Sequence, residues 1–92
     1  MIVLGELRAV SGRSDDLKKV MLEMLPGAQQ REGFQSLYVT QDIEDEGRLV
    51  LVERWASREA HQSYMAWRVE RGDLDKLGPL MAEPPVTSYL ES

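Results

Sequence analysis

Most of the side chains that could do chemistry lie in one short segment of this chain. The apolar run RLVLVERW (48–55) ends in a tryptophan, and His61, Tyr64 and Trp67 follow within the next twelve residues. His61 is the only histidine, and because an imidazole titrates near neutral pH it is the best candidate for a general base. The hydroxyl of Tyr64 can donate to an oxyanion, and the rings of Trp55 and Trp67 can wall a dry pocket. The segment therefore predicts a ligand site equipped for proton transfer.

Each of these residues also has a purely structural interpretation. His61 lies at the shoulder of the helix face that carries Tyr64 and Trp67, and could be a partly exposed histidine without a role. Trp55, Tyr64 and Trp67 could simply fill the core, since large aromatic residues usually provide buried area. On an earlier strand, Tyr38 could offer a second hydroxyl to the pocket or cap the edge of the sheet.

Two charged residues next to the segment have a structural interpretation too. Glu53 and Arg54 are consecutive in a predicted strand and so point to opposite faces of its sheet. At most one of them can face a given pocket. We expect both to serve in structural ion pairs.

Hydrophobic periodicity and capping residues predict the elements that position the segment. Ser14, followed by two acids, is a good cap for a first helix, in which Pro26 should interrupt the hydrogen bonding and after which Gly33 is the natural stop. Ser57 is the expected cap of a second helix, residues 58–71, that ends near Gly72. We predict strands at 2–10, 34–42, 48–55 and 86–90, and a short helical piece at 74–82.

This order of elements is β-α-β-β-α-β, which predicts an α+β, ferredoxin-like fold. In that arrangement a four-stranded antiparallel sheet carries its helices on one face. Length and composition agree, because 92 residues with 42% hydrophobic and 29% charged residues suit one globular domain, residues 1–92.

The strand at 48–55 is apolar on both faces over its first half, through Leu49, Val50, Leu51 and Val52. Two helices can cover only one face of the sheet. A second copy of the chain is therefore expected to cover the other, as a homodimer, and a monomer with one partly wet face is the alternative. The charges on these strands are of mixed sign, so they can pair across strands.

Composition excludes several classes of partner. The net charge of −5 and the scattered basic residues argue against nucleic acid. No apolar run is long enough to cross a membrane, and the N-terminal MIVLGELRAV predicts a strand, not a signal peptide. Cysteine is absent, which excludes thiolate chemistry and fits a reducing cytoplasm.

Three stretches carry a family resemblance: REGFQSLYV (31–39), LVERWASREAHQSY (51–64) and LGPLMAEPPVTSY (77–89). With them the chain resembles the antibiotic biosynthesis monooxygenase family, in the dimeric α+β barrel group. The resemblance implies a homodimer with a pocket in each subunit between sheet and helices. It implies activities such as oxygenation of phenolic or anthrone-type aromatics without metal or flavin, quinol oxidation, or haem degradation. It also implies that Trp55, at the strand end, lines the pocket.

The chain departs from the family pattern at several positions. Oxygenases of the family commonly use a pocket asparagine, and this sequence has none. Where the haem-degrading branch has an asparagine and an iron-ligating histidine, this chain has Leu7 and Met65. Haem degradation is therefore disfavoured, and Leu7 and Met65 are expected to contact an organic ligand instead.

These observations support a cofactor-independent monooxygenase, without a metal, acting on a phenolic, quinol or polyketide-type aromatic molecule. His61 would be the base, Tyr64 or Tyr38 the hydroxyl donor, and Trp55 and Trp67 the pocket walls. One alternative is a non-catalytic dimeric module that binds a small molecule or serves as an accessory protein. Another is a polyketide isomerase or cyclase, since the same proton-transfer groups would serve it.

Overall fold

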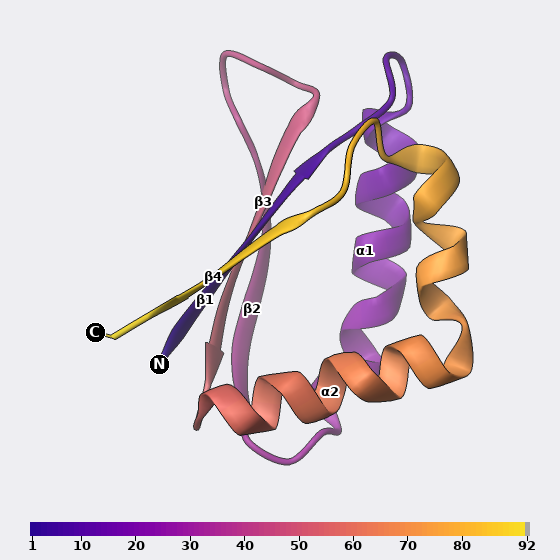
Figure 1. The fold of residues 1–92 in the computed structure, drawn as a ribbon. Coiled ribbons are helices and arrows are strands. Elements are labelled where there is room, and N and C mark those ends of the chain that lie inside the picture. The colour runs from indigo at the N-terminus through magenta and orange to yellow at the C-terminus, as the bar shows by residue number, and fades with distance from the viewer. Residues whose placement is uncertain (92) are drawn as a thin grey trace.

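In this computed structural model, which describes residues 1–91, one antiparallel sheet carries both α-helices on one face (Figure 1). Ser92, the last residue of the expected domain, lies outside the described residues. The predicted α+β, ferredoxin-like fold is confirmed. The elements are, in chain order, β1 (Ile2–Arg8), α1 (Ser14–Gln29), β2 (Phe34–Gln41), β3 (Arg48–Trp55), α2 (Arg58–Arg71), the short 3-10 helices η1 (Asp73–Lys76) and η2 (Gly78–Leu80), and β4 (Val86–Leu90).

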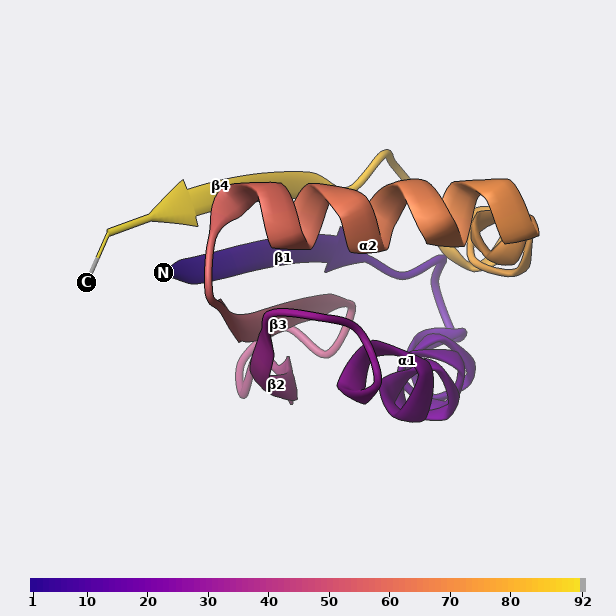
Figure 2. The same ribbon diagram turned by 90° about the horizontal axis from the view of Figure 1, so that it is seen from below.

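The strand order is β2-β3-β1-β4, so β1 and β3 lie at the centre of the sheet. β1 pairs with β3 from Ile2 opposite Arg54 to Arg8 opposite Arg48. Ile2 also lies opposite Leu90 of β4, which brings the two termini side by side (Figures 1 and 2). This register puts alternate residues of β1 and β3 on the helix side, and they form the floor on which the helices pack.

The core divides into two clusters on the helix side of the sheet. One is centred on Leu17 of α1 and Leu49 of β3. The other joins Val3, Ala28, Trp55 and Tyr64, from four different elements. Trp55 is completely buried, so the end of β3 anchors the second cluster.

The bounds of β3, α2 and β4 are as the sequence predicts. The Ser57 hydroxyl accepts a hydrogen bond from the Ala60 amide, and Gly72 takes the left-handed conformation at the other end of α2. These caps fix the start and the end of the helix that carries the candidate site residues.

Elsewhere the predicted bounds shift for identifiable reasons. Ser14 is the first residue of α1 and not its cap, because Arg13 holds the cap position and makes no side-chain capping bond. α1 continues past Pro26 and ends at Gln29, while Gly33, with φ of 85°, shapes the turn into β2. β1 stops at Arg8, since the Val10 amide turns to the Leu80 carbonyl.

The other two differences are smaller. β2 ends at Gln41, one residue before its predicted end. The helical piece expected at 74–82 is two separate 3-10 helices, η1 and η2, with Leu77 between them.

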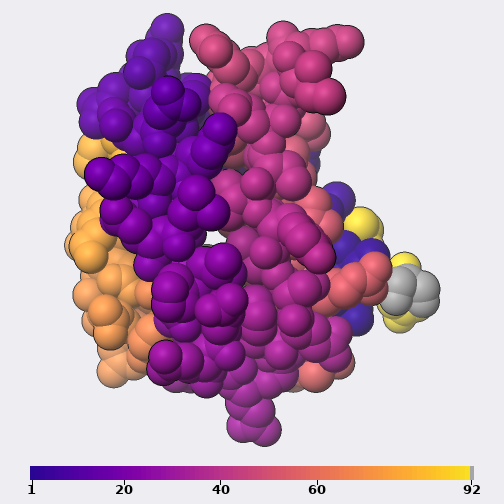
Figure 3. All heavy atoms as spheres, turned by 180° about the vertical axis from the view of Figure 1, so that it is seen from behind, coloured from indigo at the N-terminus to yellow at the C-terminus, as the bar shows by residue number. Residues whose placement is uncertain are grey.

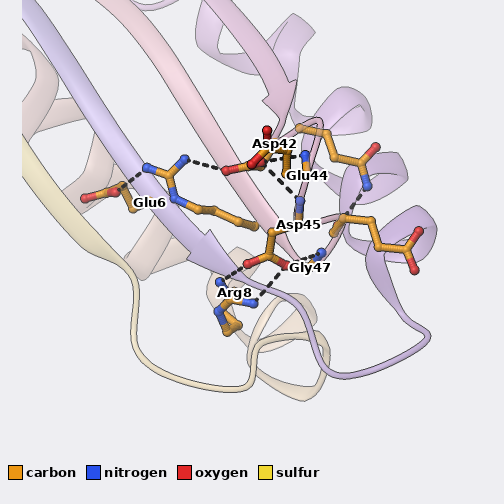
Figure 4. Close-up of polar contacts among 9 residues, drawn as sticks. Glu6, Arg8, Asp42, Glu44, Asp45 and Gly47 are labelled. Carbon is orange, nitrogen blue, oxygen red and sulfur yellow. Dashed lines mark hydrogen bonds and ion pairs between the residues drawn. The ribbon is translucent and has the colours of Figure 1, made fainter.

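The loop between β2 and β3 is held by a polar cluster (Figure 4). Arg48 donates to both Glu6 and Asp42, and Arg8 pairs with Asp45. The carboxylate of Asp42 also accepts from two loop amides. The expected pairing of charges across strands is thus found at this end of the sheet.

The face of the sheet opposite the helices carries no element of residues 1–91 in Figure 1. By the register, its central side chains include Leu4 and Val52, which lie opposite each other. Tyr38, 64% exposed, and Val86, 56% exposed, lie on the same face. None of the helices within residues 1–91 has the length and apolar character needed to cross a bilayer.

Gly33 provides a test of how tightly α2 packs against the turn into β2. A Cβ at this position would lie 2.6 Å from the Cβ of Ala60, and its φ of 85° is strained for other residues. We predict that Gly33→Ala lowers the free energy of unfolding by at least about 1–2 kcal/mol, measured by urea denaturation. Gly78→Ala is the control, because nothing lies within 4 Å of a Cβ there. Equal stability of the two variants would contradict this prediction.

Candidate functional site

A cavity of about 170 Å³ lies between the sheet and the helices. All four strands and both α-helices contribute to its lining. Figure 3 shows an opening between α1 and β2, two of these elements. The lining is mostly apolar and includes Leu7, Met21, Met24, Leu37, Leu51 and Met65. Such a surface suits a flat apolar ligand.

His61 lines this cavity from α2 and is only 3% exposed. Its Nδ1 lies 2.9 Å from the hydroxyl oxygen of Tyr89 on β4, at hydrogen-bond distance. Its Nε2 lies 3.9 Å from Oε1 of Glu53. Burial lowers the pKa of His61, which favours the neutral imidazole. The hydrogen bond at Nδ1 holds the ring of the neutral imidazole in place. Nε2 is then available to exchange protons inside the cavity.

Glu53 also belongs to the site, although the sequence did not predict it as a site residue. It lines the cavity from β3 and is 4% exposed. Its Oε1 accepts a hydrogen bond of 3.0 Å from Trp55 Nε1, and burial raises the pKa of its carboxyl group. Of the structural ion pair expected for Glu53 the structure gives only the contact with His61, which is the only basic side chain within 4.0 Å of it among residues 1–91 and carries a charge only when protonated. A buried carboxyl without an arginine or lysine partner favours its protonated form.

Tyr64 and Arg68 continue this polar group along α2, and both line the cavity. Arg68 Nε donates to the Tyr64 hydroxyl oxygen at 3.0 Å, and Arg68 Nη1 donates to Asp73 Oδ2 at 2.9 Å. A third bond runs from Arg68 Nη2 to the Met24 carbonyl of α1. Burial raises the pKa of Tyr64 although the Arg68 hydrogen bond lowers it, so the hydroxyl stays protonated at neutral pH.

Trp55 lies outside the cavity lining and supports it from behind. Its ring meets His61 edge-on at 5.6 Å between centroids and lies 5.1 Å from the ring of Tyr64. Phe34 of β2 packs edge-on against it as well. Trp55 therefore holds the orientation of the two candidate catalytic rings.

The structure brings four of the seven predicted site residues to the cavity, namely Leu7, His61, Tyr64 and Met65. Trp55, Trp67 and Tyr38 do not line it. The ring of Trp67 lies under the guanidinium groups of Arg31, Arg68 and Arg71, at 4.7–4.9 Å. Tyr38 points away on the opposite face of the sheet, where it is 64% exposed.

Sequence reasoning gave no site role to Glu53, Arg68 or Tyr89. A signal for Glu53 was present, since it is the one charged residue on the otherwise apolar face of Leu49, Leu51 and Trp55. The contacts of Arg68 and Tyr89 depend on how α1 and β4 pack, which local periodicity does not report. Within residues 1–91, no group of three or more His, Cys, Asp or Glu is placed to hold a metal ion.

The sequence matches the model of a known protein family. A family model described as "Antibiotic biosynthesis monooxygenase" matches residues 1–68. Among curated proteins, nothing matches this sequence.

Three solved structures that bear the same family name share the fold. The protein from Bordetella bronchiseptica is 18% identical, with a TM-score of 0.89 over 99% of this chain and 94% of its own. That from Caulobacter crescentus is 23% identical, with a TM-score of 0.87 over 99% and 87%. That from Chloroflexus aurantiacus is 25% identical, with a TM-score of 0.76 over 99% and 92%.

The buried carboxyl of Glu53 gives a pH-dependent prediction. Because burial raises its pKa, the folded chain binds more protons than the unfolded chain between the two pKa values. Its contribution to stability is thus present at acid pH and lost as the pH rises through the folded-state pKa. Glu53→Gln keeps an acceptor for Trp55, so we predict equal stability at acid pH and a more stable variant at alkaline pH.

Urea denaturation over a pH series measures this difference. The lowered pKa of His61 acts in the opposite sense, since its contribution is lost as the pH falls, but both proteins share it. Glu23→Gln, at an exposed position of α1, is the matched control and should show no such pH trend. A Glu53→Gln variant that is less stable than the parent at alkaline pH would disprove the prediction.

Proposed function

This chain belongs to the antibiotic biosynthesis monooxygenase family, and we propose that its cavity is the active site of a cofactor-independent monooxygenase. The substrate class is a phenolic, quinol or polyketide-type aromatic molecule. The observation that carries the proposal is that His61, Glu53 and Tyr64 line one mostly apolar cavity. This combination supplies a base, a proton partner and a hydroxyl donor away from water.

The reaction balances without an added reductant. Removal of the phenolic proton gives an anion that transfers one electron to dioxygen, and the resulting radicals join to form a C–O bond. The hydroperoxide at that carbon then loses water, with cleavage of its O–O bond and of the C–H bond, to leave a quinone carbonyl. The substrate supplies all four electrons, one oxygen atom enters the product and the other leaves as water.

In this proposal Nε2 of His61 accepts the phenolic proton. The neutral imidazole that burial favours is the form that can accept it. Nδ1 would meanwhile donate to the Tyr89 hydroxyl, which fixes the tautomer and the orientation of the ring. Glu53, whose Oε1 lies 3.9 Å from Nε2, would start protonated, donate a proton in the second step and take it back afterwards.

The residues around this group have supporting roles. Leu7 and Met65 would contact the apolar part of the substrate, and Trp55 would keep His61 and Tyr64 in place. Trp67 and Tyr38 have no contact with the cavity, so we propose that they act through packing and on the outer face of the sheet.

We also propose that the working form is a homodimer in the cytoplasm. Leu4 and Val52 lie in the middle of the outer sheet face, which no element of residues 1–91 covers. A second sheet packed on this face would bury them, as the two-faced apolar pattern of β3 requires. The lack of cysteine fits a reducing compartment.

A second function is favoured by the pairing of Glu53 with His61. Two groups that can each carry a proton suit an isomerase or cyclase, which moves a proton between two positions of a polyketide without dioxygen. The two proposals differ in whether dioxygen is consumed. Ligand binding without any turnover would instead indicate a binding or accessory module.

The oxygenase proposal predicts that dioxygen uptake depends on His61. We expect uptake with at least one member of a panel of hydroquinones, naphthols and anthrones, with a quinone as the product. His61→Ala should lower kcat by roughly 100-fold or more, as is typical for loss of a general base. Gln62→Ala, an exposed neighbour on α2, is the matched control and should retain activity. Uptake that is unchanged in His61→Ala would remove His61 as the base.

The dimer proposal predicts twice the mass of one chain by light scattering at micromolar concentration. Val52→Lys places a charge in the middle of the outer face and should give a monomer, because the buried ammonium would have no partner. Val69→Lys, at a 60% exposed position of α2, should remain dimeric. A parent protein with the mass of one chain would contradict the proposal.

A further inference from the structure

We propose that Asp73, Arg68 and Tyr64 form a polarised chain that makes the cavity bind the anionic form of its ligand, a phenolate or enolate, through the Tyr64 hydroxyl. The inference rests on the proposed function in taking this cavity as the substrate site. It goes further by naming the charge state that the site selects and two positioning residues, Arg68 and Asp73.

The hydroxyl of Tyr64 has its hydrogen free for a ligand. Its oxygen accepts from Arg68 Nε at 3.0 Å, and a guanidinium can only donate. Among residues 1–91 no other side chain is hydrogen-bonded to this hydroxyl. Tyr64 lines the cavity, so its O–H can donate to a ligand oxygen there. An adjacent cation strengthens that donor, because hydrogen bonds in a chain polarise one another.

Arg68 is fixed in position by three elements. Its guanidinium donates to Tyr64 on α2, to Asp73 in η1 and to the Met24 carbonyl of α1, and the residue is 5% exposed. α1 leaves room for it at Gly27, where a Cβ would lie 2.7 Å from Nη2. A charged group held this firmly is pre-organised to stabilise an anion.

The balance of charge around Tyr64 also favours an anion. Asp73 accepts from both Arg68 and Arg71, so one carboxylate faces two guanidinium groups. Two carboxyl groups act against an anion at this place. These are Asp73 and Glu53, whose negative charges raise the pKa of Tyr64. Glu53 is buried, however, and burial raises its own pKa and so favours its neutral form. His61, the remaining titratable residue of the cavity lining, adds no negative charge in either form.

The probe for this inference is 4-nitrophenol, a one-ring phenol whose phenolate is yellow. Its single ring suits the cavity of about 170 Å³, since a cavity of roughly 150 Å³ can hold benzene. The experiment follows the absorbance of the bound phenolate over a pH series and gives its ionisation midpoint. Dioxygen is removed beforehand so that no oxygenation takes place. We expect the bound probe to ionise at a lower pH than the free probe.

Variants assign the effect to the chain of three residues. Tyr64→Phe keeps the ring and removes the donor, and should raise the ionisation midpoint of the bound probe by roughly one pH unit or more, as expected for loss of a hydrogen bond to a charged group. Arg68→Lys keeps the charge but loses the guanidinium group that bonds to both Tyr64 and Asp73. It should raise the ionisation midpoint of the bound probe by less than Tyr64→Phe does. Asp73→Asn leaves Arg68 less well held but also removes a negative charge that disfavours an anion, so its midpoint should change less than that of Tyr64→Phe.

Arg71→Gln is the matched control, because Arg71 also pairs with Asp73 but its side chain is 55% exposed, so water screens its charge from the cavity. It should leave the midpoint of the bound probe close to that of the parent. Circular dichroism establishes that each variant is folded, and Tyr64→Phe provides the decisive test if Arg68→Lys or Asp73→Asn does not fold.

The inference is overturned if the parent protein fails to bind the probe, or if the bound probe ionises at the same or a higher pH than the free one. It is also overturned if Tyr64→Phe has the midpoint of the parent. Failure of the proposed function looks different, because it would be an absence of dioxygen uptake and product while the lowered midpoint persists. Dioxygen uptake without a lowered ionisation midpoint of the bound probe would support the proposed function and overturn the inference.

Discussion

The buried guanidinium of Arg68 is the interaction on which the arrangement of the helices and the cavity depends. A charge removed from water is costly unless hydrogen-bonded partners compensate for it, and Arg68 finds those partners on α1, η1 and α2 at once. Moving any one of these elements would leave a donor unpaired. The same group therefore joins the segments behind the sheet and sets the position of Tyr64 at the cavity wall.

A second constraint comes from the low polarity of the cavity. Glu53 and His61 lie 3.9 Å apart, and burial raises the pKa of the first and lowers that of the second. Both shifts favour the uncharged pair, a protonated carboxyl beside a neutral imidazole. Such a pair places an acid beside a base, which suits either of the proposed reactions. In an exposed site the carboxyl group would be ionised at neutral pH and could not serve as the acid.

The sequence was informative where local rules decide the structure. β3 and α2 have the predicted bounds because the apolar run of leucines and valines, the Ser57 cap and Gly72 act over a few neighbours. Placing Trp67 in the pocket failed for a geometrical reason. It shares a broad helix face with Tyr64, and the three arginines stacked on its ring hold it on the side away from the cavity.

The residues that sequence reasoning missed or misplaced depend on tertiary packing. Whether Tyr38 points in or out depends on its register with Val52 across the β2–β3 pair. The role of Arg68 depends on the space that Gly27 leaves in α1. An arginine on a helix is usually exposed, so no local pattern indicated its burial.

The missing asparagine gains a physical explanation from this site. Related oxygenases are expected to use an amide in the pocket, and an amide there would offer a neutral N–H to the ligand oxygen. In this chain the proposed donor to the ligand is the Tyr64 hydroxyl, which accepts from the Arg68 guanidinium and is polarised by its full charge. A donor of this kind favours the ionised ligand over the neutral one, whereas an amide discriminates less between them. A donor that stabilises the phenolate also reduces how much of the deprotonation His61 must drive.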